Sequence, residues 1–326
     1  MTATLEPGDG DLNVIDFDDN RLLAQLFGEH DRHLARIEQQ LGVSLLTRGN
    51  RVLIAGDPAA RRMARAALRD LYKRLKRGLS VGAGEVDGAI RMAERPSGDD
   101  TRLIRTEKHP VTARSGTQQS YLDALRNSDL VFGLGPAGTG KTYLAVAVAV
   151  SMLLEGRVDR IILTRPAVEA GERLGFLPGT LDEKIDPYMR PMYDALYDMM
   201  PAEKVMRRRD SGEIEVAPLA YMRGRTLANA FVILDEAQNA TPVQMKMFLT
   251  RLGENSRMAV TGDPSQVDLP LGSRSGLSDA LQVLRGLPDI AIVEFSHADV
   301  VRHRLVTLVV RAYEARERDL LAERKQ

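Results

Sequence analysis

The sequence contains no cysteine, which excludes a disulfide scaffold, a thiolate metal site and a cysteine nucleophile. It has no excess of charge of one sign, because 45 lysines and arginines balance 45 aspartates and glutamates. This balance excludes a polycationic protein but allows local basic patches. The longest nearly continuous apolar run, residues 143–154, is shorter than the roughly 20 residues that span a bilayer. Residues 1–10 lack the basic and apolar regions of a signal peptide. We therefore expect a soluble, cytoplasmic chain with no membrane segment.

Length and charge distribution divide the chain in two. At roughly 150 residues per domain, 326 residues suggest about two domains. Residues 48–77 are strongly basic, whereas residues 1–38 are acidic overall. The stretch 94–108 is polar and turn-prone and shows no periodicity. We predict a small domain at 1–94, a linker at 95–109 and a larger domain at 110–326.

The first domain is expected to be a small α+β module. Its apolar spacing alternates between the periods of strands and helices, with an interruption near Gly28. The expected elements are a strand at 13–17, a helix at 21–41, a hairpin at 43–46 and 52–55, and a helix at 59–79.

The second domain shows the pattern of an α/β fold. Short apolar runs, each beside a helical stretch, are typical of a buried parallel sheet with helices on both faces. The runs lie at 130–134, 160–164, 231–234, 258–261 and 290–293.

The first of these runs leads into the pattern G-x-x-x-x-G-K-T. Its glycines allow a tight turn whose backbone N–H groups point at phosphate oxygens. Lys141 would neutralise the β- and γ-phosphates, and the Thr142 hydroxyl would bind Mg²⁺. A strand before the loop and an Ala/Val-rich helix after it place phosphate at a helix N-terminus, which argues against a chance glycine turn. The predicted phosphate-binding residues are Gly135, Pro136, Ala137, Gly138, Thr139, Gly140, Lys141 and Thr142.

The apolar run at 231–234 ends in two carboxylates, Asp235 and Glu236. Asp235 suits the coordination shell of Mg²⁺, and Glu236 suits polarising the attacking water for phosphoryl transfer. A strand that ends in acids by chance is the alternative when this motif is taken alone. Together with the phosphate loop, the pair predicts a site that hydrolyses ATP or GTP.

Gln266 follows the run at 258–261 and is the third polar element. A polar group on a strand between the two phosphate-site strands is placed to sense the γ-phosphate. The alternative is an ordinary Gly-Asp-Pro turn at residues 262–264.

Together these motifs resemble those of the PhoH-like ATPases, a family similar to the first motor domain of superfamily 1 helicases. The resemblance implies a RecA-like P-loop NTPase fold and ATP rather than GTP. It also implies that Gln118, three residues before Tyr121, contacts the adenine edge, with Gln119 as the alternative. The matching stretches lie in the family's order within residues 110–318: the P-loop, 164–168 with 175–179, 220–227, 235–239, 262–266 and 299–303.

A superfamily 1 helicase closes ATP between two motor domains, and the sixty residues after Gln266 are too few for a second one. Phosphoryl transfer is accelerated by about 10³–10⁵ when an arginine reaches the γ-phosphate from a neighbour. We therefore expect a ring-like homo-oligomer, hexameric by analogy with the family. Arg274 and Arg302 are the candidates to act in trans, and ordinary surface arginines are the alternative.

The N-terminal module resembles a KH-like RNA-binding domain, with residues 28–31 at the place of the Gly-x-x-Gly backbone clamp. Asp31 replaces the second glycine, and Glu29 and Asp31 would repel phosphate. Phosphate contacts are therefore expected from basic side chains, unless these only form a solvated helix face. The candidates are Arg48, Arg51, Arg62, Arg65, Arg69, Lys73 and Lys76.

The segment 170–226 is longer than a simple crossover needs. A helix at 181–200 carries a stripe of methionines and tyrosines, which predicts core or a subunit interface. The alternative is a surface on which bases of single-stranded nucleic acid stack, and the basic run 207–209 favours it slightly.

We expect an Mg²⁺-dependent ATPase that acts on RNA or RNA-processing complexes. The family implies as partners single-stranded RNA and, in bacteria, the endoribonuclease YbeY or other ribosome-associated factors. One alternative is a nucleotide-gated scaffold with slow hydrolysis and no helicase activity. Another is a small-molecule kinase, against which Glu236 argues because it suits activating water. RNA-stimulated turnover would separate the ATPase from the scaffold.

Overall fold

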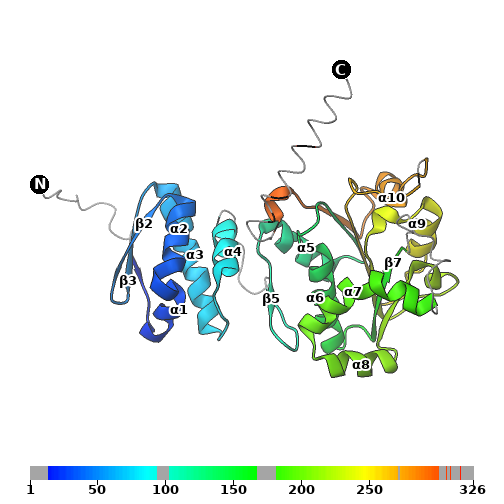
Figure 1. Cartoon of the computed structure of the whole chain (residues 1–326), viewed down its shortest axis with the longest axis horizontal. Coiled ribbons are helices and arrows are strands. Elements are labelled where there is room, and N and C mark those ends of the chain that lie inside the picture. The colour runs from blue at the N-terminus through cyan, green and yellow to red at the C-terminus, as the bar shows by residue number, and fades with distance from the viewer. Residues whose placement is uncertain are drawn as a thin grey trace, which may run out of the picture. The chain divides into compact units, whose positions relative to one another are not determined.

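The computed structural model of the chain describes residues 14–93, 103–166, 181–270, 272–300, 306, 309 and 316, with side chains from residue 188 onward in the third range. It divides into two compact units (Figure 1). The N-terminal unit comprises residues 1–103 and 112–120, and the C-terminal unit comprises residues 104–111 and 121–326. Among the described residues, no helix has the length and apolar character to cross a membrane.

The N-terminal unit packs helices against one face of a three-stranded antiparallel sheet with the order β1-β3-β2. Its core includes Ile15, Leu26, Ile37, Ile54 and Leu68, all almost fully buried. Its elements are β1 (Val14–Asp16), η1 (Asn20–Leu22), α1 (Leu23–Phe27), η2 (Glu29–Asp31), α2 (Arg32–Leu41), β2 (Ser44–Arg48), β3 (Arg51–Ala55), α3 (Pro58–Lys76) and α4 (Ala83–Ala93).

The expected helix at 21–41 is broken at residues 28–31. Gly28 has a φ of 75°, and an added Cβ there would lie 2.8 Å from the ring of His33. His30 and Asp31 also have positive φ values, which L-residues rarely adopt. The break therefore has a backbone cause, and it separates α1 from α2.

The C-terminal unit is built on a six-stranded parallel sheet with helices on both faces and the order β11-β6-β10-β9-β7-β8. This confirms the predicted P-loop NTPase fold. The strands are β6 (Leu130–Leu134), β7 (Arg160–Arg165), β8 (Ile214–Pro218), β9 (Ala230–Leu234), β10 (Arg257–Gly262) and β11 (Ile290–Glu294). All residues of β6 and β9 are buried, as expected for central strands.

The remaining elements are mostly helical. They are β4 (Leu103–Ile104), β5 (Val111–Thr112), α5 (Gly116–Asn127), α6 (Lys141–Leu154), α7 (Leu181–Met199), α8 (Ala202–Asp210), η4 (Leu219–Met222), η5 (Ala237–Asn239), α9 (Pro242–Leu249), α10 (Gly276–Leu284) and η6 (His297–Asp299). Helix α5 begins in the N-terminal unit and ends in the C-terminal one. Helix α6 is apolar around most of its circumference because it is covered on one side by the sheet and on another by α7 (Figure 1).

The sheet order brings the three polar motifs to one edge. Strand β10 lies between β6 and β9, so the loops after all three strands lie at neighbouring carboxyl ends. Ligands of open α/β sheets bind at this edge.

Candidate nucleotide site

The phosphate loop begins with a glycine that no other residue could replace without strain. Gly135 has a φ of 133°, and an added Cβ would lie 2.4 Å from the backbone oxygen of Phe295. The Phe295 N–H in turn donates to the oxygen of Leu134 at 2.7 Å. Gly138 and Gly140 also have positive φ values. The loop therefore has the tight, glycine-dependent backbone that the motif predicts.

Lys141 is folded back over this loop. Its Nζ donates to the backbone oxygens of Gly135 at 2.6 Å and Pro136 at 2.7 Å, and to Thr139 Oγ1 at 3.2 Å. The side chain is only 9% exposed. These neutral oxygens satisfy the ammonium group and hold it inside the loop.

The structure brings the two predicted metal ligands into direct contact. Thr142 Oγ1 donates a hydrogen bond of 2.6 Å to Asp235 Oδ1, although the two residues are 93 positions apart in the sequence. Thr261 Oγ1, on β10, donates to the same oxygen at 2.7 Å. Hydroxyl and carboxylate oxygens are the ligands that Mg²⁺ prefers, so this donor set fits that ion.

Glu236 is held by two side chains. Its Oε1 pairs with Arg165 Nη2 at 3.0 Å, and its Oε2 accepts a hydrogen bond from Gln238 Nε2 at 2.5 Å. Arg165 Nη1 also donates to the backbone oxygen of Tyr188 at 3.0 Å. Glu236 has a φ of 51°, a strained conformation that often marks functional residues.

Gln238 connects this carboxylate to the loop after β10. Its Oε1 accepts from the backbone N–H of Asp263 at 3.1 Å, and an added Cβ at Gly262 would lie 2.8 Å from the same oxygen. One glutamine thus bridges the ends of β9 and β10. The sequence motifs predict no separate role for Arg165 or Gln238, although both lie in stretches that carry the family resemblance.

Gln266 lies at the rim. Its side chain is exposed, and its backbone N–H donates to the oxygen of Asp263 at 3.0 Å. Asp263 Oδ1 accepts from both the N–H and the hydroxyl of Ser265. These bonds fix the turn, and the γ-phosphate role of Gln266 stays a prediction.

A cavity of about 700 Å³ lies over these groups. One wall consists of the P-loop, the carboxylates and the turn after β10, and the opposite wall consists of α7. Its lining is Ala137, Gly138, Gly140, Lys141, Thr142, Tyr143, Pro191, Asp194, Ala195, Asp198, Asp235, Glu236, Gly262, Asp263 and Gln266. Among these described lining residues, Lys141 is the only cation.

A hydrogen bond joins helix α7 to helix α6 beside this cavity. Tyr143 Oη donates to Asp198 Oδ2 at 2.6 Å, and His109 Nε2 lies 3.3 Å from the same oxygen. The Tyr143 hydrogen bond, together with His109, lowers the pKa of Asp198. The methionines expected in the core, Met189 and Met192, are buried there. Tyr193 and Tyr197 stack at 6.3 Å between ring centroids.

Three residues predicted to contact the nucleotide, Gln118, Gln119 and Arg274, do not line the cavity. Gln118 is buried, and its Oε1 accepts from the backbone N–H of Arg114 at 2.6 Å. Gln119 is buried as well. Arg274 is exposed just before α10, and Arg302 lies outside the described residues. The adenine contact and the arginine in trans stay predictions.

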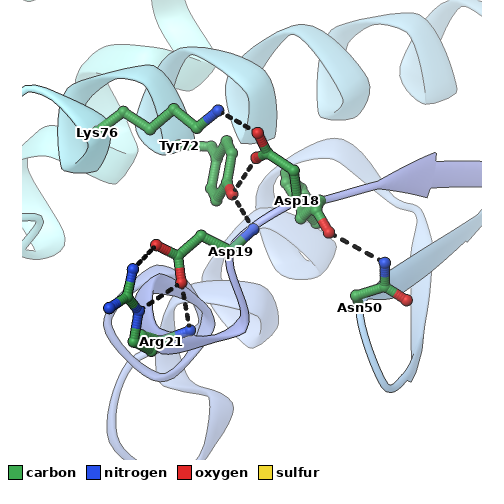
Figure 2. Close-up of polar contacts among 7 residues, drawn as sticks. Asp18, Asp19, Arg21, Asn50, Tyr72 and Lys76 are labelled. Carbon is green, nitrogen blue, oxygen red and sulfur yellow. Dashed lines mark hydrogen bonds and ion pairs between the residues drawn. The ribbon is translucent and has the colours of Figure 1, made fainter.

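Two of the basic residues expected to contact RNA are paired with carboxylates of the N-terminal unit. Lys76 Nζ lies 2.5 Å from Asp18 Oδ2, and the Tyr72 hydroxyl donates to Asp18 Oδ1 at 2.6 Å (Figure 2). Arg51 Nε lies 2.5 Å from Asp16 Oδ1. The acidic start of the chain supplies both partners. Arg48, Arg62, Arg69 and Lys73 are exposed, and Arg65 is half-buried.

A parallel sheet with a glycine-dependent phosphate loop, a Thr–Asp pair and an adjoining carboxylate defines a P-loop nucleotide-binding protein. The sequence pattern of the family described as PhoH-like protein matches residues 110–314, and the chain belongs to this family. This confirms the resemblance inferred from the motifs.

Close relatives support the assignment over most of the chain. A PhoH-like protein of Bacillus subtilis is 48% identical over 296 residues, which cover 89% of this chain and 93% of the relative. A PhoH-like protein of Mycobacterium leprae is 52% identical over 307 residues, covering 92% and 88%. Protein PhoH of Escherichia coli K12 is 50% identical over 206 residues, covering 63% of this chain and 58% of that protein.

Proposed function

We propose that the chain binds ATP with Mg²⁺ at the P-loop, hydrolyses it, and uses this reaction on single-stranded RNA or RNA-processing complexes. The observation that carries the hydrolysis proposal is the convergence of Lys141, Thr142, Asp235 and Glu236 on one cavity. Glu236 is the acid next to the Thr–Asp pair and is oriented by two side chains.

Each group has a distinct task in this proposal. Lys141 exchanges its neutral loop oxygens for phosphate oxygens, so that both donor and acceptor of each hydrogen bond are charged. Thr142 and Asp235 hold Mg²⁺, which when bound neutralises negative charge on the phosphates. Glu236 orients and polarises the attacking water. Gln266, at the rim of the cavity, senses the γ-phosphate.

The proposal includes a homo-oligomeric ring, hexameric by analogy with the family. Among the described residues that line the cavity none is an arginine, whereas phosphoryl transfer is typically accelerated by an arginine at the γ-phosphate. A neighbouring subunit is the natural source, and Arg274 and Arg302 are the candidates.

The RNA proposal rests on the basic segment 48–77 of the N-terminal unit. Exposed Arg48, Arg62, Arg69 and Lys73 lie on its surface, and cations of this kind bind nucleic-acid phosphates. YbeY or ribosome-associated factors are the protein partners that the family resemblance suggests. Cytoplasmic localisation is part of the same proposal.

Equilibrium ATP binding, measured separately from hydrolysis, tests the assigned tasks. Lys141→Ala should lose ATP affinity, whereas Glu236→Gln should retain affinity within a few-fold and lose turnover, because it keeps the shape but cannot act as a base. A Glu236→Gln protein that hydrolyses ATP at the wild-type rate would contradict the role of Glu236. If wild-type protein binds ATP tightly but turns it over negligibly even with RNA, the slow scaffold is the correct function.

A further inference from the structure

The N-terminal unit contains a cavity of about 60 Å³ between α3, α4 and residues 112–114. One buried water needs about 10–15 Å³, so there is room for several water-sized groups, such as the oxygens of one phosphate. The charged residues of its lining are the cations Lys73, Arg74, Arg77 and Arg114 and the carboxylates Asp70 and Glu85. Positive charge is therefore in excess.

Arg74 is a half-buried cation that faces neutral acceptors. Its Nε donates to the backbone oxygen of Ser80 at 2.8 Å, and its Nη1 donates to Thr112 Oγ1 at 3.2 Å. Burial lowers the pKa of the Arg74 guanidinium. The charges of Glu85 and Asp70 act against this shift, whereas the charge of Arg114 adds to it. Four cations share these two carboxylates in the lining, so the cavity keeps an excess of positive charge that a bound anion would balance.

Arg114 is fixed at the opposite wall. Gly84 and Gly88 leave space for it: an added Cβ would lie 3.4 Å from Arg114 Nη1 at Gly84 and 3.4 Å from Arg114 Cγ at Gly88. Its Nη2 pairs with Glu85 Oε1 at 2.9 Å, and Arg91 Nε donates to its backbone oxygen at 3.0 Å. Glu85 is therefore bound directly by Arg114 and acts on Arg74 only through its charge.

We propose that this cavity binds one phosphate group, with Arg74 as its central ligand and Lys73, Arg77 and Arg114 around it. The small volume fits a single tetrahedral anion, which is either inorganic phosphate or the 5′-monophosphate at the end of an RNA. All residues of this site belong to the N-terminal unit, and none belongs to the P-loop. Only the RNA arm of its test rests on the proposed RNA function.

Inorganic phosphate is the first probe. It is titrated into full-length Lys141→Ala protein, since this change removes the P-loop cation that competes for phosphate, and binding is followed by calorimetry. Added Arg74→Gln should weaken binding at least about tenfold, as expected for the loss of a hydrogen bond to a charged group. Arg77→Gln, which changes an exposed cation of the lining, gives a second test that does not disturb packing and should weaken binding less. The matched control is Arg32→Gln, an exposed charge on α2 outside the cavity, which should bind phosphate like its parent.

The RNA arm compares two oligonucleotides of one sequence, with a 5′-phosphate or a 5′-hydroxyl, by fluorescence anisotropy with wild-type protein. Tighter binding of the phosphorylated RNA, lost in Arg74→Gln, identifies the RNA end as the ligand. Equal binding of both RNAs, with phosphate still bound, identifies free phosphate. The proposal is overturned if phosphate does not bind, if Arg74→Gln binds it like its parent, or if Arg32→Gln loses as much affinity.

Discussion

The carboxylate of Glu236, the proposed base, is oriented by two neighbouring side chains. Both of its oxygens are engaged, one by Arg165 and one by Gln238, and Gln238 also holds the turn after β10. The two bonds fix the direction in which the proposed base presents its oxygens. Arg165 and Gln238 are thus positioning residues in the proposed reaction.

Replacing Arg165 should slow hydrolysis without abolishing ATP binding. In Arg165→Ala the Glu236 side chain loses one of two fixed contacts, and misplacement of a catalytic group by about 1 Å can cost up to about 100-fold. We expect a fall in kcat of about 10- to 100-fold with a small change in KM, measured by steady-state phosphate release.

The matched control is Arg160→Ala at the opposite end of β7, where the guanidinium contacts only the backbone oxygen of Ala228 in the bonds described. This variant should keep kcat near the wild-type value. Wild-type turnover in Arg165→Ala would show that the ion pair does not position Glu236.

Asp18 gives the N-terminal unit a defined pH response. Hydrogen bonds from Lys76 and Tyr72 lower its pKa from 3.8 to about 2 in the folded chain (Figure 2). A carboxylate with a lowered folded pKa stabilises the fold fully above its unfolded pKa, and this contribution is lost as pH falls through the folded value. The window is therefore between pH 4 and pH 2.

Thermal unfolding of wild-type and Asp18→Asn protein tests this. At pH 5 the variant should melt at a lower temperature, and the difference should shrink as pH falls toward 2. Lys76→Ala should show the same pattern because it removes the hydrogen bond that lowers the pKa of Asp18 most. A difference that stays constant with pH would contradict the role of the Asp18 charge.

At the scale of elements, the phosphate loop depends on the strand beside it. Gly135 packs directly on the backbone of Phe295, which follows β11. The ring of Tyr121 on α5 occupies the space left by Gly133, within 2.8 Å of where a Cβ would be, and contacts Phe295 edge-on at 5.3 Å. These close contacts hold the phosphate loop in place.

Gly135→Ala should abolish ATP binding, because the new Cβ cannot lie 2.4 Å from a carbonyl oxygen and the loop must move. Gly156→Ala is the matched control: Gly156 also has a positive φ, but nothing lies within 4 Å of its added Cβ. The control should lose about 1–2 kcal/mol of stability and keep hydrolysis. Isothermal ATP titration and thermal unfolding measure both, and unchanged ATP affinity in Gly135→Ala would refute the packing argument.

The sequence predicted those parts of the fold that carry local signals. Glycine spacing, buried apolar runs and the acids after β9 were enough to predict that Thr142 and Asp235 share one site, because parallel strands align their carboxyl ends. Helix α4 was not predicted because its glycines at 84 and 88 weaken the helical pattern. These glycines leave space for the Arg114 side chain, a contact that only the folded structure shows. The Arg165–Glu236 pair was missed because it joins residues 71 positions apart whose contact only the sheet order creates.

The whole chain joins an α+β unit that carries a basic segment, residues 48–77, to a P-loop unit. Lys141 is the only cation among the described residues of the nucleotide cavity, so the proposed reaction needs an arginine from another subunit for full activity. The basic segment supplies the proposed contact with RNA. Hydrolysis should therefore depend on both assembly and RNA.

The proposed RNA-dependent ATPase is tested by steady-state ATP hydrolysis of the full-length protein, over a range of protein concentrations with and without single-stranded RNA. We expect turnover that rises with RNA, rises more than linearly with protein concentration, and vanishes in Lys141→Ala and Glu236→Gln. A slow rate per subunit that is indifferent to RNA and to protein concentration would contradict it, and would leave a nucleotide-binding switch in place of an RNA-dependent ATPase.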